Sequence, residues 1–156
     1  MIDAFLSFLL HSLGSTLKGN YFMGVRRNLE ENFDFEIIDE FLDHYGMMID
    51  VMETLVIDLQ SEDRYMRSVD ELFRIFHNIK SASGFLQLEP MSRLSTFVED
   101  VLEQMRLFKG PANEEVVNWL LEINDFYLTW QDDLKLDNEL TKIKFSLLKS
   151  PDLEHI

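Results

Sequence analysis

Side chains that could do chemistry gather in the segment DELFRIFHNIKSASGFLQL, which covers residues 70–88. Residues spaced i, i+3, i+4 and i+7 share one face of a helix. In this segment that spacing is held by His77, Lys80, Ser81 and Gly84. The opposite face is mostly apolar and can supply the core without the histidine, through Leu72, Ile75, Ile79, Ala82, Ser83 and Leu86. We therefore expect His77 to point away from the core.

An exposed imidazole is a competent phosphoryl acceptor near neutral pH, because much of it is unprotonated and one ring nitrogen is free to attack. Lys80 lies one turn further along and can balance the charge of an added phosphate. The small residues Ser81 and Gly84 leave the ring open to the active site of a second protein. These residue types predict a phosphoacceptor histidine at position 77.

Two aromatic residues, Phe73 and Phe76, flank the histidine and form a candidate docking surface for a partner. The chain holds 13 phenylalanines, and burial in the core is the more common fate of such side chains. A docking role and a packing role therefore both stay open for these two residues. A lone histidine on a helix is more often a surface or packing residue, so the interpretation depends on its neighbours.

Four long segments with helical periodicity must position this face. Asp34 and Asn113 suit N-caps, and Pro90 suits the first turn of a helix. Short polar loops return each helix alongside the one before it, which predicts an all-α, antiparallel up-and-down four-helix bundle. The expected helices cover residues 34–60, 69–89, 90–108 and 113–136.

Further helices are expected at both ends of the chain. Leu6, Leu10, Leu13 and Leu17 give residues 4–17 helical spacing, and residues 20–33 look like a connection with one helical turn at most. In the C-terminal segment the apolar residues at helical spacing are Leu140, Ile143 and Leu147. The expected organisation is an N-terminal accessory helix and connection (1–33), the bundle (34–136) and a C-terminal accessory helix (137–156).

Composition narrows the functional classes. The 156 residues suit one domain, and 29 acidic against 14 basic residues give a formal charge of -15, which repels nucleic-acid backbones. Since the chain has no cysteine, disulfides, thiolate zinc sites and cysteine nucleophiles are excluded, and a cytoplasmic location is expected. Asp3, Ser7 and His11 interrupt the apolar N-terminal run, so we expect neither a signal peptide nor a membrane span.

Other sites are not expected from the motifs. His44 has Glu40 and Asp43 nearby, but the paired Glu-x-x-His motifs of a diiron bundle do not occur, so a surface ion pair is expected there. No calcium loop, P-loop or kinase nucleotide-binding motif occurs either. The chain therefore needs an external phosphoryl donor, and we expect no metal and no cofactor of its own.

The segment around the histidine resembles the histidine phosphotransfer (HPt) family, especially the N-terminal phosphotransfer domain of chemotaxis histidine kinases. The residues that carry the resemblance as a set are Phe73-Arg74, His77, Ile79-Lys80, Gly84 and Leu88. The resemblance covers roughly residues 35–136 and continues into LSTFVEDVLEQMR, residues 94–106. It implies that Glu99 accepts a hydrogen bond from the far ring nitrogen of His77. A carboxylate that accepts from Nδ1–H leaves Nε2 as the bare nucleophile.

The chain departs from the family at three positions. Ser81 and Gln87 stand where glycines are common, and Thr96 stands where chemotaxis kinases tend to carry a second histidine. The first two bear on how a partner fits, and the third predicts a simpler hydrogen-bond network.

The resemblance implies a phosphoryl carrier in a phosphorelay that has no ATP-binding or kinase domain. His77 would take the group from a histidine kinase or a receiver aspartate and pass it to a response-regulator receiver domain in a two-component phosphorelay. The partner would supply Mg²⁺, and the carrier is expected to be a monomer. The alternative is a helical binding module that regulates a signalling partner without being phosphorylated, in which case His77 is incidental.

Overall fold

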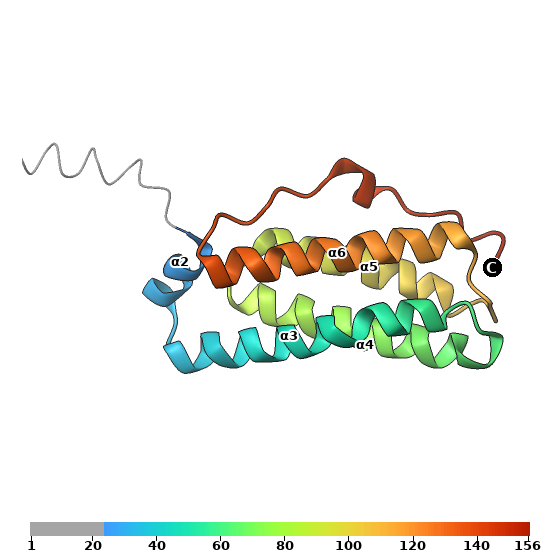
Figure 1. Ribbon diagram of the computed structural model, residues 1–156, viewed down its shortest axis with the longest axis horizontal. Coiled ribbons are helices and arrows are strands. Elements are labelled where there is room, and N and C mark those ends of the chain that lie inside the picture. Colours follow the sequence, from blue (N-terminus) through green and yellow to red (C-terminus); the bar gives the residue numbers. More distant parts are fainter. Residues whose placement is uncertain (1–23) are drawn as a thin grey trace, which may run out of the picture.

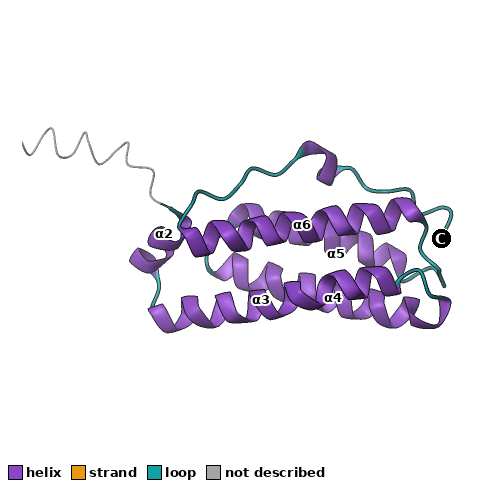
Figure 2. Ribbon diagram, viewed as in Figure 1, coloured by secondary structure: helices purple, strands orange, loops and turns teal. Residues whose placement is uncertain are grey.

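The computed structural model describes residues 24–156. Over this range the chain forms five α-helices, one 3-10 helix and no strand, as Figure 2 shows. They are α2 (Val25–Asn32), α3 (Phe35–Asp58), α4 (Glu62–Phe85), α5 (Glu89–Met105), α6 (Glu114–Leu136) and the 3-10 helix η1 (Phe145–Leu148). Helices α3 to α6 lie alongside one another with alternating direction (Figure 1). The predicted all-α antiparallel bundle is confirmed.

Helix starts follow the sequence signals to different degrees. The Asn113 side chain caps α6 by accepting a hydrogen bond from the Val116 amide at 2.9 Å, as its position suggested. Helix α4 begins at Glu62, well before the apolar pattern that starts near Val69. Its first turn is polar and carries Glu62 and Asp63, whose negative charges are favourable at the positive N-terminal end of the helix dipole. Tyr65 anchors this turn, since its hydroxyl donates to the Met105 carbonyl at 2.8 Å.

A single core runs between the four long helices, and aromatic side chains fill its centre. Tyr45, Phe76, Tyr127 and Trp130 are fully buried. The two tyrosine hydroxyls keep hydrogen bonds there: Tyr45 donates to the Tyr127 carbonyl at 2.7 Å, and Tyr127 pairs with the Ser95 hydroxyl at 2.6 Å. Burial raises the pKa of both phenols, so they stay neutral and add no buried charge to the core.

The turn between α4 and α5 sets how the two helices meet. The Leu88 amide donates to the Ser83 carbonyl at 2.8 Å, and the Gln87 amide donates to the Gly84 carbonyl at 3.2 Å. This pair of bonds is a Schellman motif, which needs a left-handed residue just after the helix. Gln87 takes that position with φ of 59°, although glycine is the residue that adopts it without strain.

We expect Gln87→Gly to raise the free energy of unfolding by about 1 kcal/mol, because it removes the left-handed strain of an L side chain. Urea unfolding should show a higher midpoint with an unchanged slope. Gln104→Gly is the matched control. Gln104 lies in α5, where the backbone has the ordinary right-handed conformation, so the same change there should lower the free energy of unfolding by about 1 kcal/mol. Equal losses in both variants would contradict the role given to Gln87.

Residues 25–32 form a full helix, α2, where the weak periodicity suggested a connection with one turn at most. Only Leu29 of this helix is buried, which explains the weak pattern. The first turn of α2 is bound by residues that follow α6: the Arg27 amide donates to Asp137 Oδ1 at 2.9 Å, and the Val25 amide donates to the Asn138 carbonyl at 2.8 Å. The helix predicted over residues 4–17 lies outside the described residues.

The C-terminal segment is not the accessory helix that was predicted. It runs extended along α6 (Figure 1) and holds only the single turn of η1. Its backbone is bound by α6 side chains: Trp130 Nε1 donates to the Thr141 carbonyl at 2.8 Å, and Asp133 Oδ2 accepts from the Thr141 amide at 2.8 Å. These bonds replace those of a helix. The apolar residues of the pattern still pack on the core, through Leu140, Ile143 and Leu147.

Candidate functional site

Helices α4 and α5 pack against each other as antiparallel neighbours, and three of the predicted site residues meet at their contact. His77 Nδ1 lies 3.4 Å from Glu99 Oε1, and Lys80 Nζ lies 2.8 Å from the same oxygen. The His77 side chain is 53% exposed, whereas that of Glu99 is only 12% exposed. The carboxylate is therefore held inside the helix contact, and the imidazole extends from it toward solvent.

The charge of Glu99 is set by opposing effects. Burial raises its pKa, but the hydrogen bonds and positive charges of Lys80 and His77 together outweigh burial and leave the pKa below its ordinary value. Glu99 is thus a carboxylate at neutral pH. Its second oxygen, Oε2, is buried and has no hydrogen-bond partner among residues 24–156. The carboxylate acts on its surroundings through Oε1.

This arrangement gives the two ring nitrogens different roles. When Nδ1 carries the ring proton, it can donate to Glu99 Oε1, and this tautomer leaves a lone pair on Nε2. The distance of 3.4 Å is long for such a bond, and bonds of this kind shorten when the ring gains charge. Thr96 is one of the positions where the chain departs from the family pattern, and its hydroxyl donates to the Ser92 carbonyl at 2.8 Å.

Two of the four residues predicted to contact a partner, Ser81 and Gly84, are exposed beside the histidine. The Ser81 hydroxyl donates to the His77 carbonyl at 3.0 Å, so it is turned back onto its own helix. A Cβ built on Gly84 would meet nothing closer than the Ser92 hydroxyl at 3.6 Å. Space for a side chain therefore exists at Gly84, and the bare backbone keeps this surface low.

The docking role predicted for Phe76 is wrong. Its side chain is fully buried and meets the Tyr127 ring edge to face at 5.5 Å. Helical spacing explains the error, since Leu72, Ile79 and Ser83 are buried on the same helix and Phe76 lies between them. The packing alternative holds for this residue.

Phe73 is partly buried and stacks on the phosphoacceptor candidate. Its ring lies 6.1 Å from the His77 ring with an interplanar angle of 13°. The Arg106 guanidinium lies 3.9 Å from the centre of the Phe73 ring. Arg106 also pairs with Asp70 at 3.0 Å and with Glu103 at 2.6 Å. Sequence reasoning missed Asp70 and Arg106, although Asp70, Phe73 and His77 have i, i+3, i+7 spacing.

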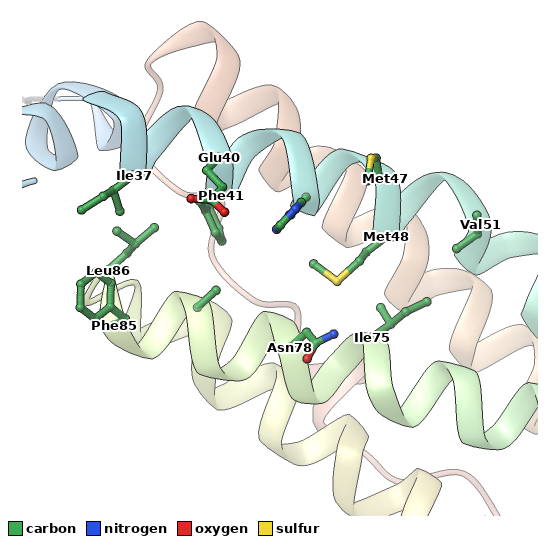
Figure 3. A pocket seen from close by; sticks show the side chains of 12 residues that line it. Ile37, Glu40, Phe41, Met47, Met48, Val51, Ile75, Asn78, Phe85 and Leu86 are labelled. Atoms are coloured by element: carbon green, nitrogen blue, oxygen red, sulfur yellow. The ribbon is translucent and has the colours of Figure 1, made fainter. Parts of the chain in front are cut away.

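A groove of about 640 Å³ lies between α3 and α4; its lining includes His44 of α3 but not His77. Figure 3 shows side chains of both helices turned into it, with Asn78, the neighbour of His77, on the α4 side. Three of its apolar residues are strongly exposed: Met47 by 62%, Val51 by 50% and Phe85 by 62%. Sequence reasoning missed this groove. The signal that could have found it is in residues 47–51, which hold more apolar side chains than one buried helix face requires.

Among residues 24–156, no helix combines the length and the apolar character that a membrane crossing needs.

An antiparallel helical bundle that presents one exposed histidine, backed by a carboxylate and a lysine, defines the class of histidine phosphotransfer modules. The sequence model described as "Hpt domain" matches residues 36–144, which is more than half of the chain. The chain belongs to the Hpt domain family.

Curated relatives agree with this assignment. The chain is 28% identical over 90 residues to the chemotaxis protein CheA of Borreliella burgdorferi, a match that covers 58% of this chain and 10% of that protein. It is 24% identical over 86 residues to CheA of Treponema pallidum, with 55% of this chain and 11% of that protein covered. The sensor histidine kinase CheAY of Helicobacter pylori is 26% identical over 94 residues, 60% of this chain and 12% of its own length.

The chain thus spans about a tenth of the length of these relatives. No solved structure matches it significantly.

Proposed function

We propose that this protein is a phosphoryl carrier of two-component signalling and that His77 is its phosphoacceptor. The observation that carries the proposal is the exposed imidazole whose Nδ1 faces the buried carboxylate of Glu99. Such a ring has one nitrogen held and one free to attack. Family membership and the CheA relatives support the same role.

In the proposed reaction, His77 Nε2 attacks the phosphorus of an aspartyl phosphate on a receiver domain. The Nε2–P bond forms while the bond between phosphorus and the aspartyl oxygen breaks, and the aspartate leaves as a carboxylate. Glu99 holds the Nδ1 proton and offsets the positive charge that the ring gains, and Lys80 offsets the charge of the phosphoryl group. Mg²⁺ held by the partner would neutralise charge on the phosphoryl oxygens. The reverse reaction returns the group to a receiver.

The partner is proposed to dock over Ser81 and Gly84 and to use the adjoining groove. Helix α3 lines this groove and carries seven acidic residues but no lysine or arginine, so a basic partner surface fits it. We place the exchange in the cytoplasm, between this protein as a monomer and a histidine kinase or a receiver domain.

Met47→Glu, which puts a charge into the groove, is expected to weaken receiver binding about tenfold, because it opposes burial of an apolar contact. The rate of transfer at saturating receiver should stay within about twofold, since the change is remote from the reacting atoms. Ile57→Glu is the matched control: Ile57 is exposed on the same helix but does not line the groove. Stopped-flow transfer at varied receiver concentration measures both quantities, and equal effects of the two variants would place docking elsewhere.

The proposal is tested by incubating the full chain with a receiver domain phosphorylated by acetyl phosphate, or with a promiscuous histidine kinase and ATP. We expect the chain to acquire phosphate that acid removes and alkali does not, which is the behaviour of a phosphohistidine. If no donor labels the chain while it still binds receivers, the non-phosphorylated binding module is the better account.

A further inference from the structure

Four side chains form a continuous contact from the α4–α5 interface to the candidate phosphoacceptor. Asp70 pairs with Arg106, the Arg106 guanidinium lies on Phe73, and Phe73 stacks on His77. Glu103 holds Arg106 from a second side at 2.6 Å. Asp70, Phe73 and His77 belong to α4, whereas Arg106 follows the last turn of α5. The position of the imidazole is thus connected to the packing of both helices.

The hydrogen bond to Glu99 does not fix the imidazole by itself. It joins one ring atom over 3.4 Å, and the His77 side chain is 53% exposed. Rotation about the bond between Cβ and the ring has only broad preferences, so one long hydrogen bond leaves the ring plane free to turn. The ring of Phe73 lies nearly parallel to it, at 13°, and is the neighbour that restricts this turning.

We propose that Phe73 is a positioning residue that holds the plane of the His77 ring, and that Arg106 holds Phe73 in place. The proposal rests on the function proposed above and replaces the docking role predicted for Phe73. The lone pair of Nε2 lies in the ring plane, so the plane determines whether the nitrogen meets phosphorus in line with the leaving oxygen. Small errors in this approach cost large factors in rate.

The same contact favours the charged ring. When Nε2 bonds to phosphorus and the Nδ1 proton stays with the ring, the imidazole carries positive charge. An aromatic ring next to a cation stabilises it, and Glu99 stabilises it at the other side. Phe73 therefore acts on the transferring state more than on the binding of a partner.

Phe73→Leu is expected to lower the rate of transfer from a receiver phosphorylated with acetyl phosphate about tenfold at saturating receiver, with the receiver Kd within about twofold. Phe73→Tyr keeps the ring and should restore most of the rate. Arg106→Gln should lower the rate about threefold, because Phe73 loses its support. Arg93→Gln, which removes an exposed arginine paired with Glu89 on the same helix, is the control and should leave the rate unchanged. A rise in Kd with an unchanged rate would return Phe73 to docking and overturn the proposal.

A second readout does not depend on phosphotransfer. In the unmodified full chain, the carbon-bound ring protons of His77 lie beside the Phe73 ring and should show ring-current displaced NMR shifts. Phe73→Leu should move them toward the positions of a free histidine, while the His44 signals stay in place. Unchanged His77 shifts would overturn the proposal even if transfer occurs, whereas shifted signals without any transfer would count against the proposed function alone.

Discussion

His77→Gln is expected to abolish acid-labile phosphorylation of the chain by every donor. Glutamine keeps a polar side chain of moderate size at an exposed site but has no nucleophilic ring nitrogen, so no phosphoramidate bond can form. The fold should be retained, because the side chain is 53% exposed and the core of α4 lies on the opposite face. Labelling with radioactive phosphate, followed by acid treatment, measures the loss, and circular dichroism checks the fold.

Another histidine in the described part of the chain provides the control. His44 lines the groove on α3, and His44→Gln should leave the amount of label unchanged, although it can alter the receiver concentration that is needed. Label that survives in His77→Gln would show that the phosphoacceptor is a different residue. Label lost in both variants would indicate that the groove, rather than the ring, limits the reaction.

Much of the site could be predicted from the sequence because helical geometry is regular. His77 and Lys80 lie three residues apart on one helix, so their common face follows from the period alone. Glu99 required one further step, because its contact with His77 depends on how α4 and α5 meet. The short turn at residues 86–88 makes these helices antiparallel neighbours, and the resemblance to the family selected Glu99 among several acids of α5.

The remaining features depend on choices that periodicity does not report. Phe76 and Phe73 lie three residues apart near the histidine, yet one is fully buried and the other is not, since the boundary of the core passes between them. In the C-terminal segment, Leu140 and Leu147 pack on the core without a helix because Trp130 and Asp133 bind the extended backbone. Partners of this kind come from distant positions in the chain, so a local pattern cannot identify them.

Glu99→Gln is expected to slow phosphotransfer about a hundredfold while leaving the site assembled. The amide has the same shape as the carboxylate but lacks its charge, so it no longer offsets the positive charge of the ring during attack. It can also turn its NH₂ group toward His77, which would favour a proton on Nε2 and remove the free lone pair. The rate at saturating receiver should therefore fall while the receiver Kd stays within about twofold.

The same substitution should change how stability depends on pH. The pKa of Glu99 is lowered in the folded protein, so the stabilisation that its charge provides is complete above the pKa of the unfolded chain. It is lost as the pH falls through the lower, folded pKa. The difference in the free energy of unfolding between the natural chain and Glu99→Gln should therefore be largest at neutral pH and shrink in acid. Asp100→Asn removes one charge from the exposed neighbouring position and should show neither effect.

The two measurements separate two roles that Glu99 could have. A carboxylate that only ties Lys80 into the helix contact would change stability with pH but leave the rate at saturating receiver intact. One that only orients the imidazole would change the rate with little effect on stability. Since Oε1 lies within 2.8 Å of Lys80 and 3.4 Å of His77, we expect both to change together, and a variant that moves only one of them would show which contact matters.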